Sequence, residues 1–184
     1  MSMALGRSVK QAVVFLEQIY KDIYSFVQSM DGSLSERGWK SVEQNRISED
    51  LGNGLTAKHW VMHRLYRLYV PEKKGHPVHA LAVMVHLTPE GYDEAMVLVT
   101  AVRFPKEGQR TPEDILSTWI SSEDVFRSLS SSTEPRSVDE KLRAEGFFHG
   151  AEAAWAFVIP LCELTDTGAL RQRLIEPGLA LFER

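Results

Sequence analysis

Cysteine is almost absent from this 184-residue sequence, whose single thiol is Cys162. One thiol cannot form an internal disulfide, so nothing points to an oxidising compartment. Cys162 ends the apolar run 158–162, and free cysteines are among the most buried residue types, so we expect it to be buried. The sequence also lacks a basic-then-apolar leader and any uncharged apolar stretch of about 18 residues. These absences predict a cytoplasmic protein without a membrane span.

Short catalytic and nucleotide-binding motifs are absent as well. The sequence contains no Gly-x-Ser-x-Gly, no Gly-x-Gly-x-x-Gly, no Walker loop and no His-Glu-x-x-His. Each of these patterns places a nucleophile, a phosphate-binding turn or a pair of metal ligands, and none of those devices can be recognised here. We therefore expect no cofactor, assign no metal site, and favour a protein that is not an enzyme.

The composition is that of an ordinary folded domain. Apolar residues make up 43% of the chain and charged residues 25%, with a net charge of −4. Those shares are typical of globular proteins, and the length suits one domain covering residues 1–184. We predict an α+β fold with a mainly antiparallel sheet of four or more strands. The expected element order is α-βββ-α-β-α, with the helices packed on the sheet.

Residues 9–30 carry apolar side chains at spacings of three and four, which predicts an amphipathic helix. Gly32 follows as the expected left-handed residue that ends it. The apolar stripe is wider than one narrow seam, which leaves two interpretations: the helix only covers the sheet, or its surplus face joins a second copy of the chain. The candidate interface residues are Val13, Leu16, Tyr20, Ile23 and Val27.

Three strand candidates lie at 59–70, 78–87 and 94–104, separated by short turns that contain glycine or proline. Connections this short favour antiparallel neighbours, so we predict a meander. The second and third candidates contain almost unbroken apolar runs, which are typical of strands covered on both faces.

The remainder of the chain predicts a fourth strand within 150–164. Its Pro160 cannot donate to a ladder, so we expect this strand at a sheet edge or with a bulge. Further helices are expected around 35–50, 111–129, 138–144 and 169–175, the last of them ending at Pro177-Gly178, with a flexible loop at 130–137.

Histidines and carboxylates offer one possible catalytic site. Neutral imidazole is a common general base and metal ligand, and a converging carboxylate would orient it. Whether these side chains converge depends on strand register, which the sequence does not fix. The candidates are His63, His79, His86, His149, Glu94 and Glu152.

A basic-aromatic stretch at 58–74 is the second candidate site. Alternation along a strand places Arg64 and Tyr66 on one face, and Arg67 and Tyr69 on the other. Interleaved cations and rings suit a phosphorylated ligand or a single-stranded nucleic acid. The overall acidic charge disfavours nucleic acid. The candidate ligand-binding residues are Trp60, Arg64, Tyr66, Arg67 and Tyr69.

Three functional hypotheses remain open. The first is a binding or regulatory module for a small molecule or protein, which associates with itself as a homo-oligomer. The second is an enzyme that uses the histidine–carboxylate candidates. The third is nucleic-acid binding through residues 58–74.

Overall fold

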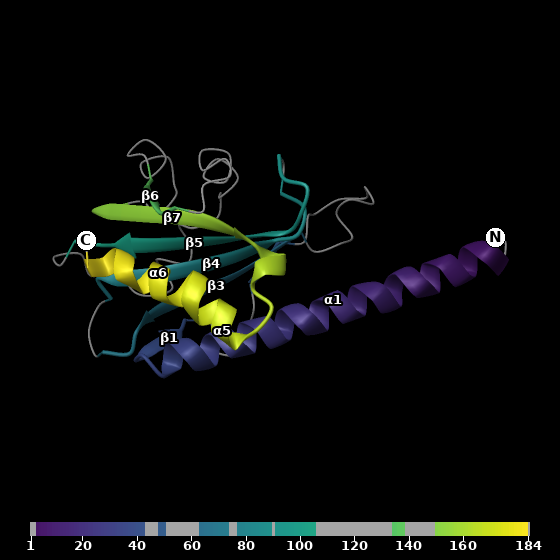
Figure 1. Ribbon diagram of the computed structural model, residues 1–184, viewed down its shortest axis with the longest axis horizontal. Helices are drawn as coiled ribbons and strands as arrows, with labels where there is room; N and C mark the ends of the chain where they lie inside the picture. Colours follow the sequence, from purple (N-terminus) through teal and green to yellow (C-terminus); the bar gives the residue numbers. More distant parts are fainter. Residues whose placement is uncertain are drawn as a thin grey trace.

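The apolar runs of the sequence form a seven-stranded antiparallel sheet with helices against it, as the computed structural model shows (Figure 1). The structure describes residues 3–42, 48–50, 63–73, 77–89, 91–105, 134–138 and 150–183. The α+β class predicted from the sequence is confirmed. The strands are β1 (Trp39–Ser41), β2 (Ser48–Asp50), β3 (Arg64–Pro71), β4 (His79–His86), β5 (Met96–Arg103), β6 (Arg136–Ser137) and β7 (Ala153–Pro160).

The strands β3, β4 and β5 form the predicted meander. They lie side by side in chain order, and the sheet runs β1-β3-β4-β5-β7-β6, with β2 also paired to β3. Tyr69 of β3 lies opposite Leu81 of β4, which in turn lies opposite Ala101 of β5. Residues opposite one another share a face, so this register sorts every side chain to one side of the sheet.

Both faces of the central strands are buried, as the unbroken apolar runs predicted. Leu81, Val83 and Val85 of β4 belong to one hydrophobic cluster, together with side chains of the N-terminal and C-terminal helices. Ala82 and Met84, between them in the sequence, belong to a second cluster on the opposite face. The sheet therefore separates two cores, and helices cover the first of them (Figure 1).

Helix α1 (Met3–Ser35) is 33 residues long and lies only partly on the sheet. Its C-terminal half packs against the sheet beside the C-terminal helices, while its N-terminal half projects beyond the body of the molecule (Figure 1). The prediction that it ends at Gly32 was wrong. The left-handed residue is Gly38, with φ of 74°, and its amide donates to Ser35. Gly32 is accommodated inside the helix because Met30 and Leu34 still face the core on either side of it.

The C-terminal helical region continues beyond the predicted end at Pro177-Gly178. It consists of α5 (Thr167–Leu170), a π-helical segment η3 (Arg171–Ile175), α6 (Glu176–Ala180) and a 3-10 turn η4 (Leu181–Glu183). Proline cannot supply the amide that a regular turn needs, and the wider π turn directly precedes it. Gly178 then lies close to the sheet, where a Cβ atom would come within 3.2 Å of Leu81. Pro177-Gly178 was therefore misread as the end of the helix, because at this point the helix only changes its type.

Other predictions for the chain had mixed outcomes. The short helix expected around 35–50 was wrong where the structure describes it, since β1 and β2 occupy its two ends. Strand β7 pairs with β5 along its whole length, but its other side meets only the two residues of β6 among the described strands. Pro160 is the last residue of β7, beyond that short pairing. The helices expected at 111–129 and 138–144 lie outside the described residues.

Candidate interaction surface on the first helix

The apolar residues of α1 follow one unbroken seven-residue repeat. Their spacing alternates strictly between four and three, which is the repeat of a helix that packs along one seam. The side chains at the C-terminal end of this row are buried: Ile23 and Val27 are each 4% exposed, and Leu34 is 0% exposed. We call the whole row the α1 seam. It comprises Val9, Val13, Leu16, Tyr20, Ile23, Val27, Met30 and Leu34.

Cover decreases along the first half of the α1 seam, where Tyr20 still packs against the core on the helix side of the sheet. Val9 is 47% exposed and Val13 is 49% exposed, while Leu16 and Tyr20 are half-buried. The predicted interface residues are thus divided, because Ile23 and Val27 pack inside the molecule and Val13 faces solvent. The change falls where α1 leaves the sheet (Figure 1).

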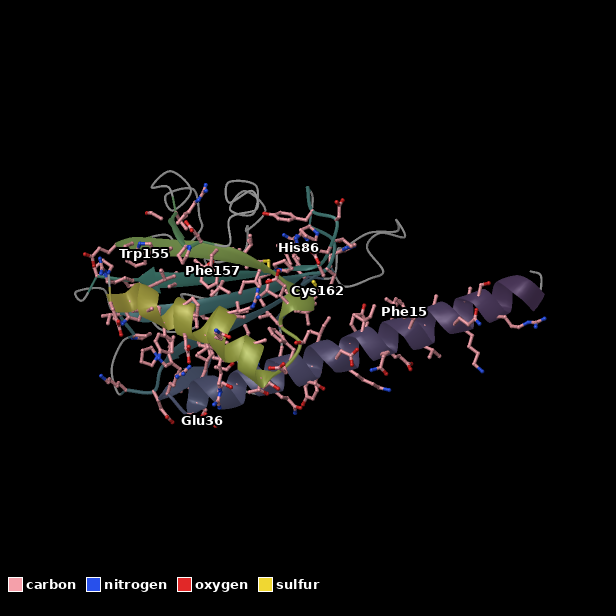
Figure 2. The ribbon with its side chains drawn as sticks, viewed as in Figure 1. Phe15, Glu36, His86, Trp155, Phe157 and Cys162 are labelled. Atoms are coloured by element: carbon pink, nitrogen blue, oxygen red, sulfur yellow. The ribbon has the colours of Figure 1, made fainter. Side chains whose placement is uncertain are left out.

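Large apolar side chains outside the α1 seam are also exposed on this helix. Val14, Phe15 and Tyr24 are 56%, 66% and 53% exposed. Phe15 lies on the projecting part of the helix, away from the sheet and the C-terminal helices (Figure 2). Isolated exposed apolar residues are ordinary, and contiguous exposed patches are typical of interaction sites, so we take the exposed apolar residues of α1 as a candidate surface.

A groove of about 650 Å³ opens between α1 and the segment that follows β7. Ile19, Ile23 and Phe26 form its α1 wall, and Leu161, Leu164 and Leu170 face them. The charged residues among its described lining are two aspartates, Asp22 and Asp166, and no lysine or arginine lines it there. The groove therefore combines an apolar floor with a negative rim.

Two polar contacts fix the far wall of the groove. Asp166 caps α5 by accepting a hydrogen bond from the Ala169 amide at 2.9 Å, and hydrogen bonds from backbone amides lower the pKa of its carboxyl. The Cys162 thiol donates to Glu94 Oε2 at 2.9 Å, and that bond raises the pKa of the thiol. The prediction that Cys162 is buried was wrong, because the 3-10 turn η2 (Leu161–Glu163) follows Pro160 and leaves the thiol exposed.

The basic-aromatic residues of β3 are divided between the two faces, as alternation predicted. Arg67 and Tyr69 point toward α1, where Arg67 Nε donates to Asp31 Oδ1 at 3.1 Å and Tyr69 Oη donates to the same oxygen at 2.6 Å. The Arg67 side chain is 5% exposed and that of Asp31 is 32% exposed, so the guanidinium is buried while the carboxylate is partly open to water. Arg64 and Tyr66 lie on the opposite face, and Trp60 lies outside the described residues.

Asp31 controls the protonation of both partners. Burial raises the pKa of Tyr69 well above its ordinary value, and the negative charge of Asp31 raises it further. Burial alone would lower the pKa of Arg67, but the hydrogen bond and charge of Asp31 raise it overall. Arg67 and Tyr69 therefore hold α1 against the sheet, and their predicted role in ligand binding would require that network to open.

The catalytic candidates lie at two opposite ends of the sheet. His63 precedes β3, His86 ends β4 and Glu94 precedes β5, which brings these three to one end. His79 begins β4 and Glu152 precedes β7 at the other end, about 23 Å away along a strand of this length. The five residues therefore do not form one site, and His149 lies outside the described residues.

Each described histidine has its own surroundings. His63 Nδ1 lies 2.9 Å from Thr88 Oγ1, and the His86 side chain is buried. His79 contacts the Phe182 ring at 4.7 Å between centroids, and burial followed by the charge of Arg103 lowers its pKa. Within the described part of the chain, no three histidine, cysteine or carboxylate side chains are grouped to hold a metal ion.

Two features of the surface were missed by reasoning from the sequence. Trp39 stacks on Phe182 with 5.2 Å between ring centroids, and His79 packs against Phe182 in a tilted arrangement. The groove beside α1 was missed as well, because its walls come from residues more than 130 positions apart. The single local signal near it was the Asp166-Thr167 helix cap, which marks a helix start but not a groove.

Comparisons with protein-family models, with curated proteins and with solved structures gave no match. Among the described residues, no helix is long and apolar enough to cross a membrane. The exposed half of α1 and the groove beside it are therefore the features on which a functional proposal can rest.

Proposed function

We propose that this protein is a protein-binding module that associates with itself through the N-terminal half of α1. One observation carries the proposal: the α1 seam is buried from Ile23 onward and exposed at Val9 and Val13, with no change in its repeat. The buried half demonstrates what the repeat is suited to do, which is to pack against another element. A second copy of the chain is a natural partner, because it carries the same exposed apolar residues.

The energetics allow a reversible association. Burying an exposed aliphatic side chain contributes about 1.5 kcal/mol or more, so Val9 and Val13 of two copies would contribute about 6 kcal/mol, and the half-buried Leu16 and Tyr20 about half as much again. Loss of translational and rotational freedom opposes this by at least about 4 kcal/mol. About 5 kcal/mol remains, so a dissociation constant on the order of 100 μM is the expected strength.

Sedimentation equilibrium over a concentration series tests the proposal. We expect the wild-type protein to shift from monomer to dimer at concentrations on the order of 100 μM. Val13→Asp would place a charge in the exposed half of the seam and leave the protein monomeric, with its melting temperature in dilute solution unchanged because Val13 contacts no core. Gln11→Asp adds the same charge at an exposed position outside the seam and should still associate. A wild-type protein that stays strictly monomeric at these concentrations would contradict the proposal.

A further inference from the structure

We infer that the two copies pair their first helices in antiparallel orientation, with Val13 of one copy opposite Leu16 of the other. This inference rests on the proposed self-association and adds the orientation, the register and the role of the groove. In an antiparallel helix pair, the numbers of the two residues that face each other add to the same total in every layer. With the layers Val13–Leu16 and Val9–Tyr20, all four positions in the first half of the seam find an apolar partner in the second copy.

Charge complementarity selects this orientation. Lys10 and Glu17 are exposed and seven residues apart, so they lie on the same flank of the seam. Antiparallel pairing in the stated register places Lys10 beside Glu17 of the second copy, and Glu17 beside Lys10, which gives two symmetric ion pairs. Parallel pairing would instead place Glu17 beside the apolar flank at Ala12 and Ile19. The charged flank thus has a partner in one orientation only.

The body of the protein favours the same orientation. From Ile23 onward the seam is occupied by the chain's own sheet, so only the projecting half can receive a second helix. Parallel pairing would bring two sheets to the same end of the helix pair, where they would compete for space. Antiparallel pairing places the two bodies at opposite ends.

The groove accommodates the end of the second helix. In this register residues 6–8 of the second copy lie level with residues 21–23, at the α1 wall of the groove. The groove lies on the flank of Ile19, opposite the flank of Lys10 and Glu17, so the side of the arriving turn that faces it is uncharged and includes Ser8. Gly6, next in the repeat before Val9, lies level with Ile23, where the seam is already buried, and brings no side chain to that level.

The area of the contact also calls for the groove. Stable interfaces bury about 1,200 Å² or more in total, and the layers of the seam give each copy only four contact positions. Contact between the first turns of each helix and the groove of the other copy supplies the remainder. The site is therefore incomplete without the second copy, and each copy contributes one groove.

Disulfide trapping tests the register directly. In a Cys162→Ser background, Val9→Cys and Tyr20→Cys variants would be oxidised separately and as a mixture, then separated on a non-reducing gel. We expect the covalent dimer in the mixture and not in either variant alone, because antiparallel pairing brings residue 9 to residue 20. Dimers within each separate variant would indicate parallel pairing and overturn the inference. No crosslink in a mixture that sediments as a dimer would overturn it too, while leaving the proposed self-association intact.

Charge reversal provides an independent check on folded protein. Lys10→Glu and Glu17→Lys each turn two attractive pairs into repulsive ones, so each variant alone should associate about tenfold more weakly. Mixing the two variants restores opposite charges in a heterodimer and should recover wild-type affinity. Sedimentation of each sample at low salt, repeated at high salt where the differences shrink, gives the readout. Equal affinities in all samples would contradict the pairing of Lys10 with Glu17.

Discussion

At the scale of single residues, Asp31 is the contact that fixes α1 to the sheet. Its carboxylate accepts hydrogen bonds from both Arg67 and Tyr69, and it is the point at which the helix meets β3. A buried cation whose partner is removed keeps its desolvation cost and loses its compensation. Asp31 therefore stabilises the fold mainly because, without it, a buried positive charge would lack its compensating carboxylate.

Asp31→Ala should destabilise the protein by about 3 kcal/mol, since it leaves the buried Arg67 without its carboxylate. Urea denaturation of the variant and the wild type measures the difference. Asp22→Ala removes an exposed aspartate from the same helix, one that accepts a hydrogen bond from Gln18, and should change stability far less. Equal losses in the two variants would show that the Arg67–Asp31 pair has no special role.

His79 gives the fold a dependence on pH. Burial and the charge of Arg103 lower its pKa, so the folded protein resists its protonation more than the unfolded chain does. Neutral His79 therefore contributes to the free energy of unfolding. This stabilisation is present above the pKa of the unfolded chain, about 6.5, and is lost as the pH falls from there through the lower pKa of the folded protein. When the pH is lowered from 7.5 to 5.5, the urea midpoint of unfolding should therefore fall less in His79→Gln than in the wild type. The same fall in both proteins would remove His79 as the cause.

At the scale of elements, much of the sheet was predictable and the helix ends were not. The meander of β3 to β5 followed from short connections and from apolar runs of strand length. The strands β1 and β2 have three residues each, too few for alternation to be recognised, so residues 35–50 were misread as a helix. Gly32 and Pro177 looked like stops because their local preferences are strong. Packing of Leu34 and Leu181 on the sheet outweighs those preferences.

Two glycine substitutions separate local preference from packing. Gly178→Ala should destabilise the protein by about 1–2 kcal/mol, because its Cβ atom would meet Leu81 and Val99, which are fully buried at the centre of the sheet. Gly32→Ala places the same methyl group in open space inside α1 and should stabilise it by about 0.5–1 kcal/mol. Thermal denaturation of both variants provides the comparison. Effects of the same sign would contradict the close approach of α6 to the sheet.

At the scale of the whole molecule, the two halves of α1 have the same apolar repeat, but one half is buried and the other projects into solvent. The sequence showed the surplus apolar face, but periodicity cannot tell which turns meet the chain's own sheet and which project beyond it. That division depends on where the Asp31 network anchors the helix and on how long the strands are. The candidate catalytic residues were separated for a similar reason, because strand direction places His86 and His79 at opposite ends of β4.

The projecting half of α1 is about 27 Å of helix supported mainly by its own hydrogen bonds. The packed half of α1 already supplies the nucleus of this helix, so the projecting turns depend on propagation alone, which is close to neutral for most residues. Association would supply a tertiary contact for these turns, so their order would depend on how many copies of the chain are nearby. Under the proposed self-association, concentration would act on this protein as a folding variable, and the abundance of the chain would set the fraction of molecules whose first helix is complete.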